Sequence, residues 1–185
     1  MTEKSLSMLA DPQPCGHMVL PYSADDQLIE AVALFTAAGL DKDQAVILVT
    51  TEAHRSALRD RLKIQGFSAR ALESTGQLVW MDAETLLSSF AFDGIIDELV
   101  FTTKIGALIN KAAVSGGKSR RVRVFGEMVN LLWVDSMHAT EKLEQLWNRV
   151  VEAHRVPLLC GYALARIGGE QFPESLTACH SHSLA

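Results

Sequence analysis

Glu127 is the residue whose type and position most directly suggest chemistry. It follows Gly126 at the end of a short apolar run, residues 122–125, that is typical of a buried strand. In open parallel α/β sheets, ligands bind in the crevice beyond the carboxyl ends of the strands. A carboxylate at such a strand end is therefore a candidate polar anchor for a ligand. An acidic residue there can also do no more than cap the following helix, and both interpretations stay open.

Histidines and cysteines form a second group with metal-ligand chemistry. Cys179, His180 and His182 lie close together near the end of the sequence. Thiolates and imidazole nitrogens bind transition metals, and His17 with Glu127 could complete such a site. A tail of this composition is more often only polar. We therefore predict no metal, and we keep Cys179, His180 and His182 as the candidate ligands if one binds.

The remaining motifs give little support to catalysis. No nucleophile elbow of the Gly-x-Ser-x-Gly type occurs. Cys160 lies inside an apolar strand segment, which indicates a buried structural thiol and not a reactive one. His54 and His138 are interpreted as surface or loop residues. The chain is accordingly expected not to be an enzyme.

The sequence argues against a nucleotide-binding phosphate loop, although Gly117-Lys118-Ser119 resembles the end of one. The first glycine of the motif would fall at position 112, which is Ala112. The segment also precedes a strand, so its amides would not open a helix toward a phosphate. The basic cluster around it, which includes Arg123, is interpreted as a solvated loop and strand start.

Strand-like apolar runs alternate along the chain with segments of helical periodicity. The strands and helices that they predict must position these groups. Helix-like segments separate the strand candidates, among them residues 23–38, capped by Ser23 and stopped by Gly39, and residues 93–113. No hairpin signal is apparent. The pattern predicts a three-layer α/β domain with a mostly parallel sheet of about five strands and helices on both faces. The strand candidates are residues 17–22, 45–50, 78–81, 122–125 and 158–163.

Length, charge and cysteine content narrow the class of protein. We expect a loosely ordered leader, residues 1–14, and one domain, residues 15–185. A net charge of −5 argues against direct binding to nucleic acid or to a membrane. The longest apolar region, residues 94–113, contains charged residues, so no membrane span is predicted. Three scattered cysteines favour a reducing cytoplasm.

Taken in order, several short motifs resemble the MEDS family, the sensory domain of methanogens, methylotrophs and the dichloromethane-responsive regulator DcmR. Their order and spacing cover roughly residues 15–184. The chain departs from the family pattern at Pro21 and Ser183. The motifs are Gly16–Tyr22, Ala45–Thr51, Ser74–Val79, Gly126-Glu127-Met128, Trp133, Leu159–Tyr162 and His182.

The resemblance implies a RecA/KaiC-like fold that has lost its phosphate loop and serves as a ligand-sensing module in signal transduction and transcription regulation. It implies that the strand bearing Glu127 lies beside the strand bearing His17, and that the ligand is a small, hydrocarbon-derived molecule. A pocket over the strand ends would have apolar walls and a few convergent polar groups. The expected ligand-binding residues are His17, Tyr22, Glu127, Met128, Trp133, Tyr162 and His182.

These observations predict a cytoplasmic, non-catalytic sensory domain that needs no cofactor. Its output is expected to pass to a histidine kinase or a transcription regulator, or through a homodimer. Two alternatives remain: a degenerate nucleotide-binding scaffold related to ATPases, and a transition-metal-binding module. The pairing of His17 with Glu127 is open to a functional and to a purely structural interpretation.

Overall fold

A computed structural model describes residues 1–133, 135–164 and 172–184. Its helices and strands follow one another along the chain, and a 3₁₀ helix lies at Ser115–Gly117. The elements are α1 (Glu3–Ala10), β1 (His17–Tyr22), α2 (Asp25–Asp41), β2 (Ala45–Thr50), α3 (Glu52–Ile64), α4 (Ala69–Ser74), β3 (Leu78–Asp82), α5 (Ala83–Ser88), β4 (Ala91–Phe92), β5 (Ile95–Ile96), α6 (Glu98–Ala113), β6 (Val122–Gly126), α7 (Met128–Leu132), α8 (Met137–His154), β7 (Leu158–Ala163), α9 (Glu174–Ala178) and β8 (His182–Ser183).

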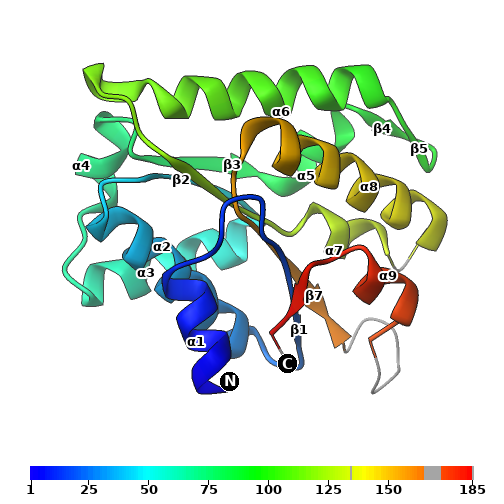
Figure 1. The fold of residues 1–185 in the computed structure, drawn as a ribbon, viewed down its shortest axis with the longest axis horizontal. Coiled ribbons are helices and arrows are strands. Elements are labelled where there is room, and N and C mark those ends of the chain that lie inside the picture. The colour runs from blue at the N-terminus through cyan, green and yellow to red at the C-terminus, as the bar shows by residue number, and fades with distance from the viewer. Residues whose placement is uncertain (134, 165–171, 185) are drawn as a thin grey trace.

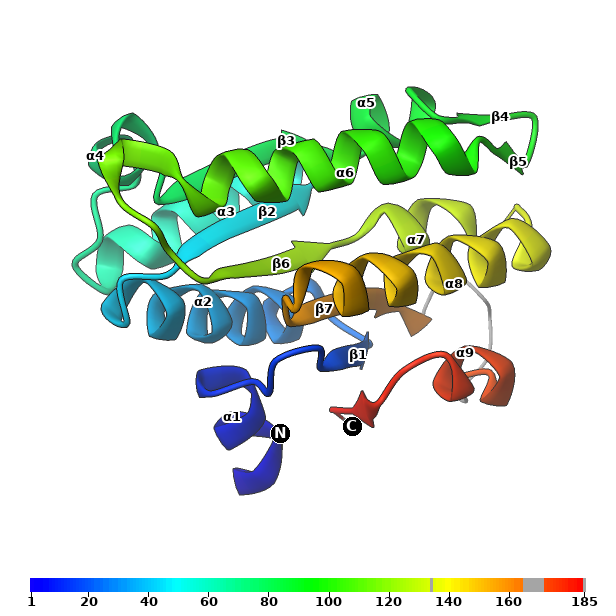
Figure 2. The same ribbon diagram turned by 45° about the horizontal axis from the view of Figure 1, so that its top comes forward.

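The main sheet has six strands in the order β3-β2-β6-β7-β1-β8, and its neighbouring strands are parallel. Figures 1 and 2 show α6 and α8 on one side of this sheet and α2 with α3 on the other. The predicted three-layer α/β architecture is confirmed, and each of the five predicted strands is present. The short edge strand β8 is the addition. Because all strands run the same way, their carboxyl ends meet at one edge of the sheet.

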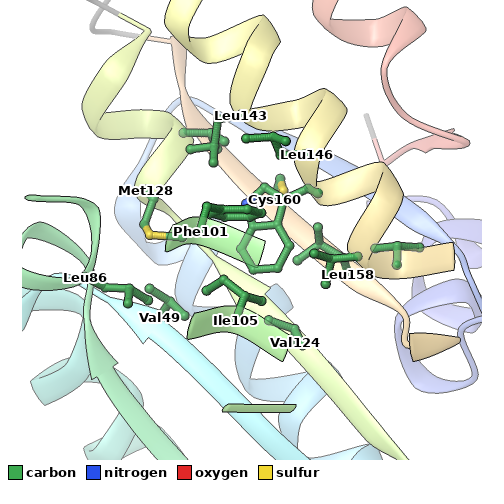
Figure 3. Packing of buried hydrophobic residues seen from close by; sticks show 14 of the residues in the cluster. Val49, Leu86, Phe101, Ile105, Val124, Met128, Leu143, Leu146, Leu158 and Cys160 are labelled. Atoms are coloured by element: carbon green, nitrogen blue, oxygen red, sulfur yellow. The ribbon is translucent and has the colours of Figure 1, made fainter. Parts of the chain in front are cut away.

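Two apolar clusters fill the space on either side of the sheet. Strand β2 lies between β3 and β6 and all six of its residues are buried, as expected for a strand covered on both faces. Side chains of α6 and α8 pack on one face, where Figure 3 shows Phe101, Leu146 and Cys160 close together. Side chains of α2 and α3 pack on the other face. None of the helices that the structure describes combines the length and hydropathy needed to cross a bilayer.

The segment before α6 differs from the predicted continuous helix. Strands β4 and β5 form a small antiparallel hairpin whose turn is Asp93-Gly94, with φ angles of 49° and 76°. Asp-Gly is a favoured pair for turns with two positive φ angles. The helical spacing of the neighbouring isoleucines concealed this signal. The helix begins only after Asp97, whose side chain accepts a hydrogen bond from the Val100 amide at 2.9 Å.

The chain start and Arg123 also differ from expectation. Residues 1–14, predicted as a loosely ordered leader, contain α1, which is anchored by the fully buried Leu9. Arg123, interpreted as solvated, is 1% exposed and donates to the carbonyl oxygen of Phe35 at 2.7 Å. Its guanidinium also stacks 4.9 Å from the centre of the Phe35 ring. An arginine that satisfies its donors in this way can lie inside a fold.

Helix α2 starts and ends differently from the prediction. Its cap position is Ala24, without a side-chain capping bond, and not Ser23. The helix also continues past Gly39 to Asp41. Gly39 lies inside the helix. A side chain is excluded at this position because a Cβ would stand 2.6 Å from Nε of Arg123. The glycine makes room for the buried arginine and does not stop the helix.

Replacing Gly39 with alanine is expected to lower the free energy of unfolding by about 1–3 kcal/mol, the usual cost of overpacking a filled interior. Urea unfolding followed by circular dichroism measures the change. Gly106→Ala in α6 is the comparison and should lose less, since its Cβ would approach only the half-buried His154 ring, at 3.2 Å, and that side chain can shift. Equal midpoints for Gly39→Ala and the unaltered protein would show that Arg123 does not depend on this space.

Candidate site at the carboxyl edge of the sheet

Glu127 occupies the end of the central strand β6 and is completely buried. Its Oε1 accepts a hydrogen bond from the backbone amide of Thr51, and its Oε2 lies 2.6 Å from Nδ1 of His54. Although Glu127 is at the N-terminal boundary of α7, its side chain makes no capping bond to that helix. The interpretation as a helix cap is therefore wrong. The carboxylate instead joins the end of β6 to the start of α3.

His54 connects this buried carboxylate to the surface. Its side chain is 13% exposed, and its Nε2 lies 3.5 Å from Oδ1 of Asp25, which is 75% exposed at the start of α2. The Tyr22 ring meets the His54 ring edge-on, with centroids 6.5 Å apart. The expectation that His54 is a surface or loop residue is wrong, because α3 turns it inward over the end of β6. Asp25, His54 and Glu127 form a continuous polar link, which we call the edge relay.

The relay favours a charged imidazole. The hydrogen bond to Glu127 raises the pKa of His54 above its usual value; burial opposes this shift, and the charges of Glu127 and Asp25 add to it. A protonated ring can donate from both nitrogens, one toward each carboxylate. A ligand that approaches Asp25 or His54 would therefore change the charge distribution beside the buried Glu127.

Stability should depend on pH through His54. A group whose pKa is raised on folding contributes stability that is fully present below its unfolded pKa, about 6.5, and is lost as pH rises through the folded value. The free energy of unfolding is thus expected to fall above about pH 6.5. Urea titrations across neutral pH measure it. The decline should be smaller in His54→Gln and unchanged in His138→Gln, which alters an exposed histidine; equal declines in both would contradict this assignment.

A hollow lies at the carboxyl end of β1, against the first turn of α2. Its volume is about 410 Å³. The first turn of α2 is shared between the two features, since Asp25 belongs to the relay and Asp26 to the wall of the hollow. The lining residues are Met1, Leu20, Pro21, Asp26, Gln27, Glu30 and Leu184. This is a mostly apolar wall with polar groups at the helix end.

The predicted pocket residues do not converge on one point. Tyr22 lies near His54 and is joined by a 3.4 Å hydrogen bond from the Asn130 amide. Met128 and Trp133 are 1% and 3% exposed and belong to the apolar core on the α6–α8 face. Figure 3 shows Met128 among these core side chains. A ligand-binding role for each of them stays a prediction.

The expected pairing of His17 with Glu127 is wrong. Strand β7 lies between β1 and β6, so the two strands are not neighbours as the resemblance implied. His17 is in register with Leu158, and Leu158 with Val124, three residues before Glu127. Because side chains alternate along a strand, an odd offset also places His17 and Glu127 on opposite faces of the sheet.

His17 belongs instead to a second buried polar group, around Glu144 of α8. Nε2 of His17 lies 3.2 Å from Oε2 of this carboxylate, and Nε2 of His180 lies 3.2 Å from its Oε1. The hydroxyl of Tyr162 also donates to Glu144, and Cys160 lies 3.3 Å from His17. Burial by itself would raise the pKa of Glu144, but the facing His17 and His180 rings lower it well below its usual range. We call these five residues the Glu144 cluster.

The three predicted metal-ligand candidates near the end of the chain separate in the structure. His180 enters the Glu144 cluster, whereas the thiol of Cys179 faces the carbonyl oxygen of Ser175 at 3.4 Å. His182 lies in β8, where its Nδ1 is 2.9 Å from the Ser181 hydroxyl. Cys160 is fully buried, as predicted, and burial is the main cause that raises the pKa of its thiol. Such a thiol is a poor nucleophile.

Sequence reasoning missed His54, Asp25 and Glu144. The first two carry no local signal, because their meeting depends on α2, α3 and β6 converging at one edge. Glu144 did carry one: it lies within the apolar stripe of its helix, beside Leu143 and Trp147. A charged residue at an interior helix position must find buried partners.

Comparison with known proteins adds one match to these observations. Residues 16–181 match the model of the family described as MEDS, MEthanogen/methylotroph, DcmR Sensory domain. The match covers both polar groups, from His17 through Glu127 and Glu144 to His180. A comparison with curated proteins gives no match.

Proposed function

The chain belongs to the MEDS family of sensory domains, and from this membership we propose that it is a non-catalytic sensor of a small molecule. The molecule binds at the carboxyl ends of the strands, beside the edge relay. The single observation that carries this location is the link from the exposed Asp25 through His54 to the fully buried Glu127. Through such a link, ligand binding at the surface can change the polar contacts at the centre of the sheet.

The ligand class follows from the chemistry of the hollow. Leu20, Pro21 and Leu184 supply apolar surface, and Asp26 with Gln27 supplies hydrogen-bonding groups at one end. Small-molecule sites generally combine mostly apolar walls with a few placed polar groups, in volumes of about 300–1,000 Å³. A small hydrocarbon derivative with one polar group fits this description. Its polar group would reach the first turn of α2, where Asp25 begins the relay.

The proposed response is a change in the contact between the starts of α2 and α3. Asp25 belongs to the first turn of α2, and Thr51 precedes the first turn of α3. Both are held to Glu127, one through His54 and one through the backbone amide. A ligand can shift a conformational equilibrium only by binding its two states unequally. A ligand that makes different polar contacts with Asp25 or His54 in the two states would bind those states unequally.

The output is proposed to pass to a histidine kinase or a transcription regulator, or through a homodimer, in the cytoplasm. All three cysteines lie in the described part of the chain and are free thiols, which supports a reducing compartment. We also propose a RecA/KaiC-like relationship for the fold. The parallel sheet with helices on both faces supports it, whereas the position of β7 between β6 and β1 departs from the implied arrangement.

Thermal unfolding with a panel of one- to three-carbon alcohols, aldehydes, amines and halides tests the proposal. A ligand at a hundred times its dissociation constant stabilises the folded state by about 2.7 kcal/mol. For a chain of this size that free energy corresponds to a melting temperature higher by roughly 5–10 °C. The shift should shrink in His54→Gln and persist in His138→Gln. A panel without any shift, or equal shifts in both variants, would contradict the proposal.

The same assay separates the nucleotide-binding alternative. Stabilisation by ATP with magnesium, and by no member of the panel, would replace the sensory proposal with a nucleotide scaffold. Native mass spectrometry of freshly purified protein complements the assay, since it reports a co-purified molecule and the oligomeric state in one measurement.

A further inference from the structure

The Glu144 cluster offers four groups with metal-ligand chemistry in one buried place. The ligand atoms of His17, Glu144, Cys160 and His180 all lie within 4.8 Å of one another. His17 begins β1, Cys160 is in β7, Glu144 is in α8, and His180 follows α9, so four separate elements converge here. Three of the side chains are at most 2% exposed, and the imidazole of His180 is fully buried. This place is on the opposite face of the sheet from the edge relay.

Hydrogen bonds fix which nitrogen of each imidazole faces the cluster. Nδ1 of His17 lies 2.8 Å from Oδ1 of Asn148, and the amide of Asn148 is oriented by its own donation to the carbonyl oxygen of Cys179 at 2.9 Å. Nδ1 of His180 lies 2.7 Å from the carbonyl oxygen of Leu176. Both partners are acceptors, so each Nδ1 carries its proton. A neutral ring then has a lone pair on Nε2, the metal-binding tautomer.

Those two lone pairs face a carboxylate, which cannot donate to them. Among the described residues, Nε2 of His180 finds no hydrogen-bond partner of acceptable geometry although it is buried 3.2 Å from Glu144. Nε2 of His17 can accept from the Cys160 thiol, 3.3 Å away, which leaves Nε2 of His180 as the buried nitrogen without a donor. The two ring centroids are only 4.2 Å apart, so both Nε2 atoms are directed to the same place. A single cation between the rings and the carboxylate would give the lone pair of His180 and the carboxylate a common partner.

We propose that His17, Glu144, Cys160 and His180 bind one divalent transition-metal ion of the zinc class. Two neutral imidazoles, one carboxylate and one thiolate carry a net charge of −2, which a divalent ion neutralises inside the fold. The ligand set of two nitrogens, one sulfur and one oxygen suits zinc or cobalt better than magnesium or calcium, which prefer oxygen ligands. Binding releases the thiol proton of Cys160 to solvent and forms the bond from its sulfur to the metal.

Three of the separations between ligand atoms are close to those of a four-coordinate site. Tetrahedral zinc with bond lengths of about 2.0–2.3 Å separates neighbouring ligand atoms by roughly 3.3–3.6 Å. The separations are 3.2 Å from His17 to Oε2 of Glu144, 3.2 Å from His180 to Oε1, and 3.3 Å from His17 to Cys160. Cys160 lies farther from Glu144, at 3.9 Å, and all four ligand atoms lie within 4.8 Å of one another, so a bound ion would draw them closer together. The second layer of a metal site is also present, since Asn148, the Leu176 carbonyl and the Tyr162 hydroxyl orient three of the ligands.

The proposed metal would fasten the C-terminal segment to the body of the domain. Beyond His180, this segment is attached by hydrogen bonds between Ser181 and the backbone of His17 and by the short strand β8. A closed site with four protein ligands is typical of structural metals, whose binding energy adds directly to folding stability. Removing the metal should therefore loosen α9 and β8 and leave the edge relay in place.

Titration of tag-free, chelator-treated protein with Co²⁺ and with Zn²⁺ tests the site. One equivalent of Co²⁺ should give the visible absorption of a tetrahedral complex together with a sulfur-to-cobalt charge-transfer band. Zn²⁺ should displace the cobalt and raise the melting temperature, and elemental analysis of the protein before chelation should find zinc or a similar metal near one equivalent.

Conservative variants assign the ligands. Cys160→Ser should abolish the charge-transfer band, whereas Cys179→Ser, a neighbouring thiol outside the cluster, should keep it. His17→Gln should weaken Co²⁺ binding at least tenfold, and His182→Gln should not. Absence of one-equivalent binding in the unaltered protein, or a charge-transfer band that survives in Cys160→Ser, would overturn the proposal. Circular dichroism of each variant confirms that it is folded before the titration.

Discussion

Replacing Glu144 with alanine is expected to cost about 3–5 kcal/mol of folding free energy, the usual result of removing one member of a buried charged group. The change leaves the Tyr162 hydroxyl and two imidazole nitrogens facing an empty space in a completely buried place. Urea unfolding followed by intrinsic fluorescence measures the loss. Glu144→Gln should lose less, because the amide oxygen still accepts a hydrogen bond from Tyr162.

Glu152→Ala is the matched control, since it removes an exposed glutamate from the same helix. Surface substitutions of this kind usually change stability by less than about 0.5 kcal/mol. If Glu144→Ala were as stable as Glu152→Ala, the cluster would not act as a stabilising polar group. The comparison should be made with chelator-treated protein, so that the carboxylate is tested separately from any metal.

Replacing Glu127 with alanine is expected to cost about 3 kcal/mol or more, because two charge-assisted hydrogen bonds are lost in a buried position. The Thr51 amide and the inner nitrogen of His54 lose their partner. The same variant should lose the thermal response to the ligand panel. Thermal unfolding with and without the ligand that stabilises the unaltered protein measures both effects.

Two further variants separate stability from sensing. Glu127→Gln keeps the size and one acceptor of the side chain and removes its charge, so it should remain folded and respond weakly to ligand. Glu52→Gln, at an exposed position in the first turn of α3, should respond as the unaltered protein does. A full response in Glu127→Gln would show that the relay carries no part of the signal.

The layered fold could be predicted from the sequence because its signals are local. The unbroken apolar run of residues 45–50 indicated the strand β2. A local signal of the same kind is Asp82, whose carboxylate accepts from the Thr85 amide at 2.8 Å at the start of α5. The hairpin at Asp93-Gly94 was missed because the apolar residues around it also fit helical spacing. The helical pattern and the turn signal compete in such a segment, and the Asp-Gly pair should have decided between a helix and a hairpin.

The polar groups could be predicted only in part. Glu127 was recognised as important from its place at a strand end, but its partner His54 depends on the packing of α3 over β6. His17 and His180 were noted as potential ligands, but joined to the wrong carboxylate, because the order of β1, β7 and β6 cannot be read from the chain. Residues far apart in sequence meet only through topology, and one sequence contains little information on that.

Backbone amide spectra of the ¹⁵N-labelled protein, recorded during titration with each member of the ligand panel, test the central claim most directly. A stabilising ligand should shift the amide signals of Tyr22, Asp25, Thr51 and His54 first, at one edge of the sheet. Signals at the opposite edge, such as those of Gln44 and Val122, should stay unchanged. Saturable shifts confined to the opposite edge, or no saturable shift with any ligand, would contradict a sensory site at the carboxyl ends of the strands.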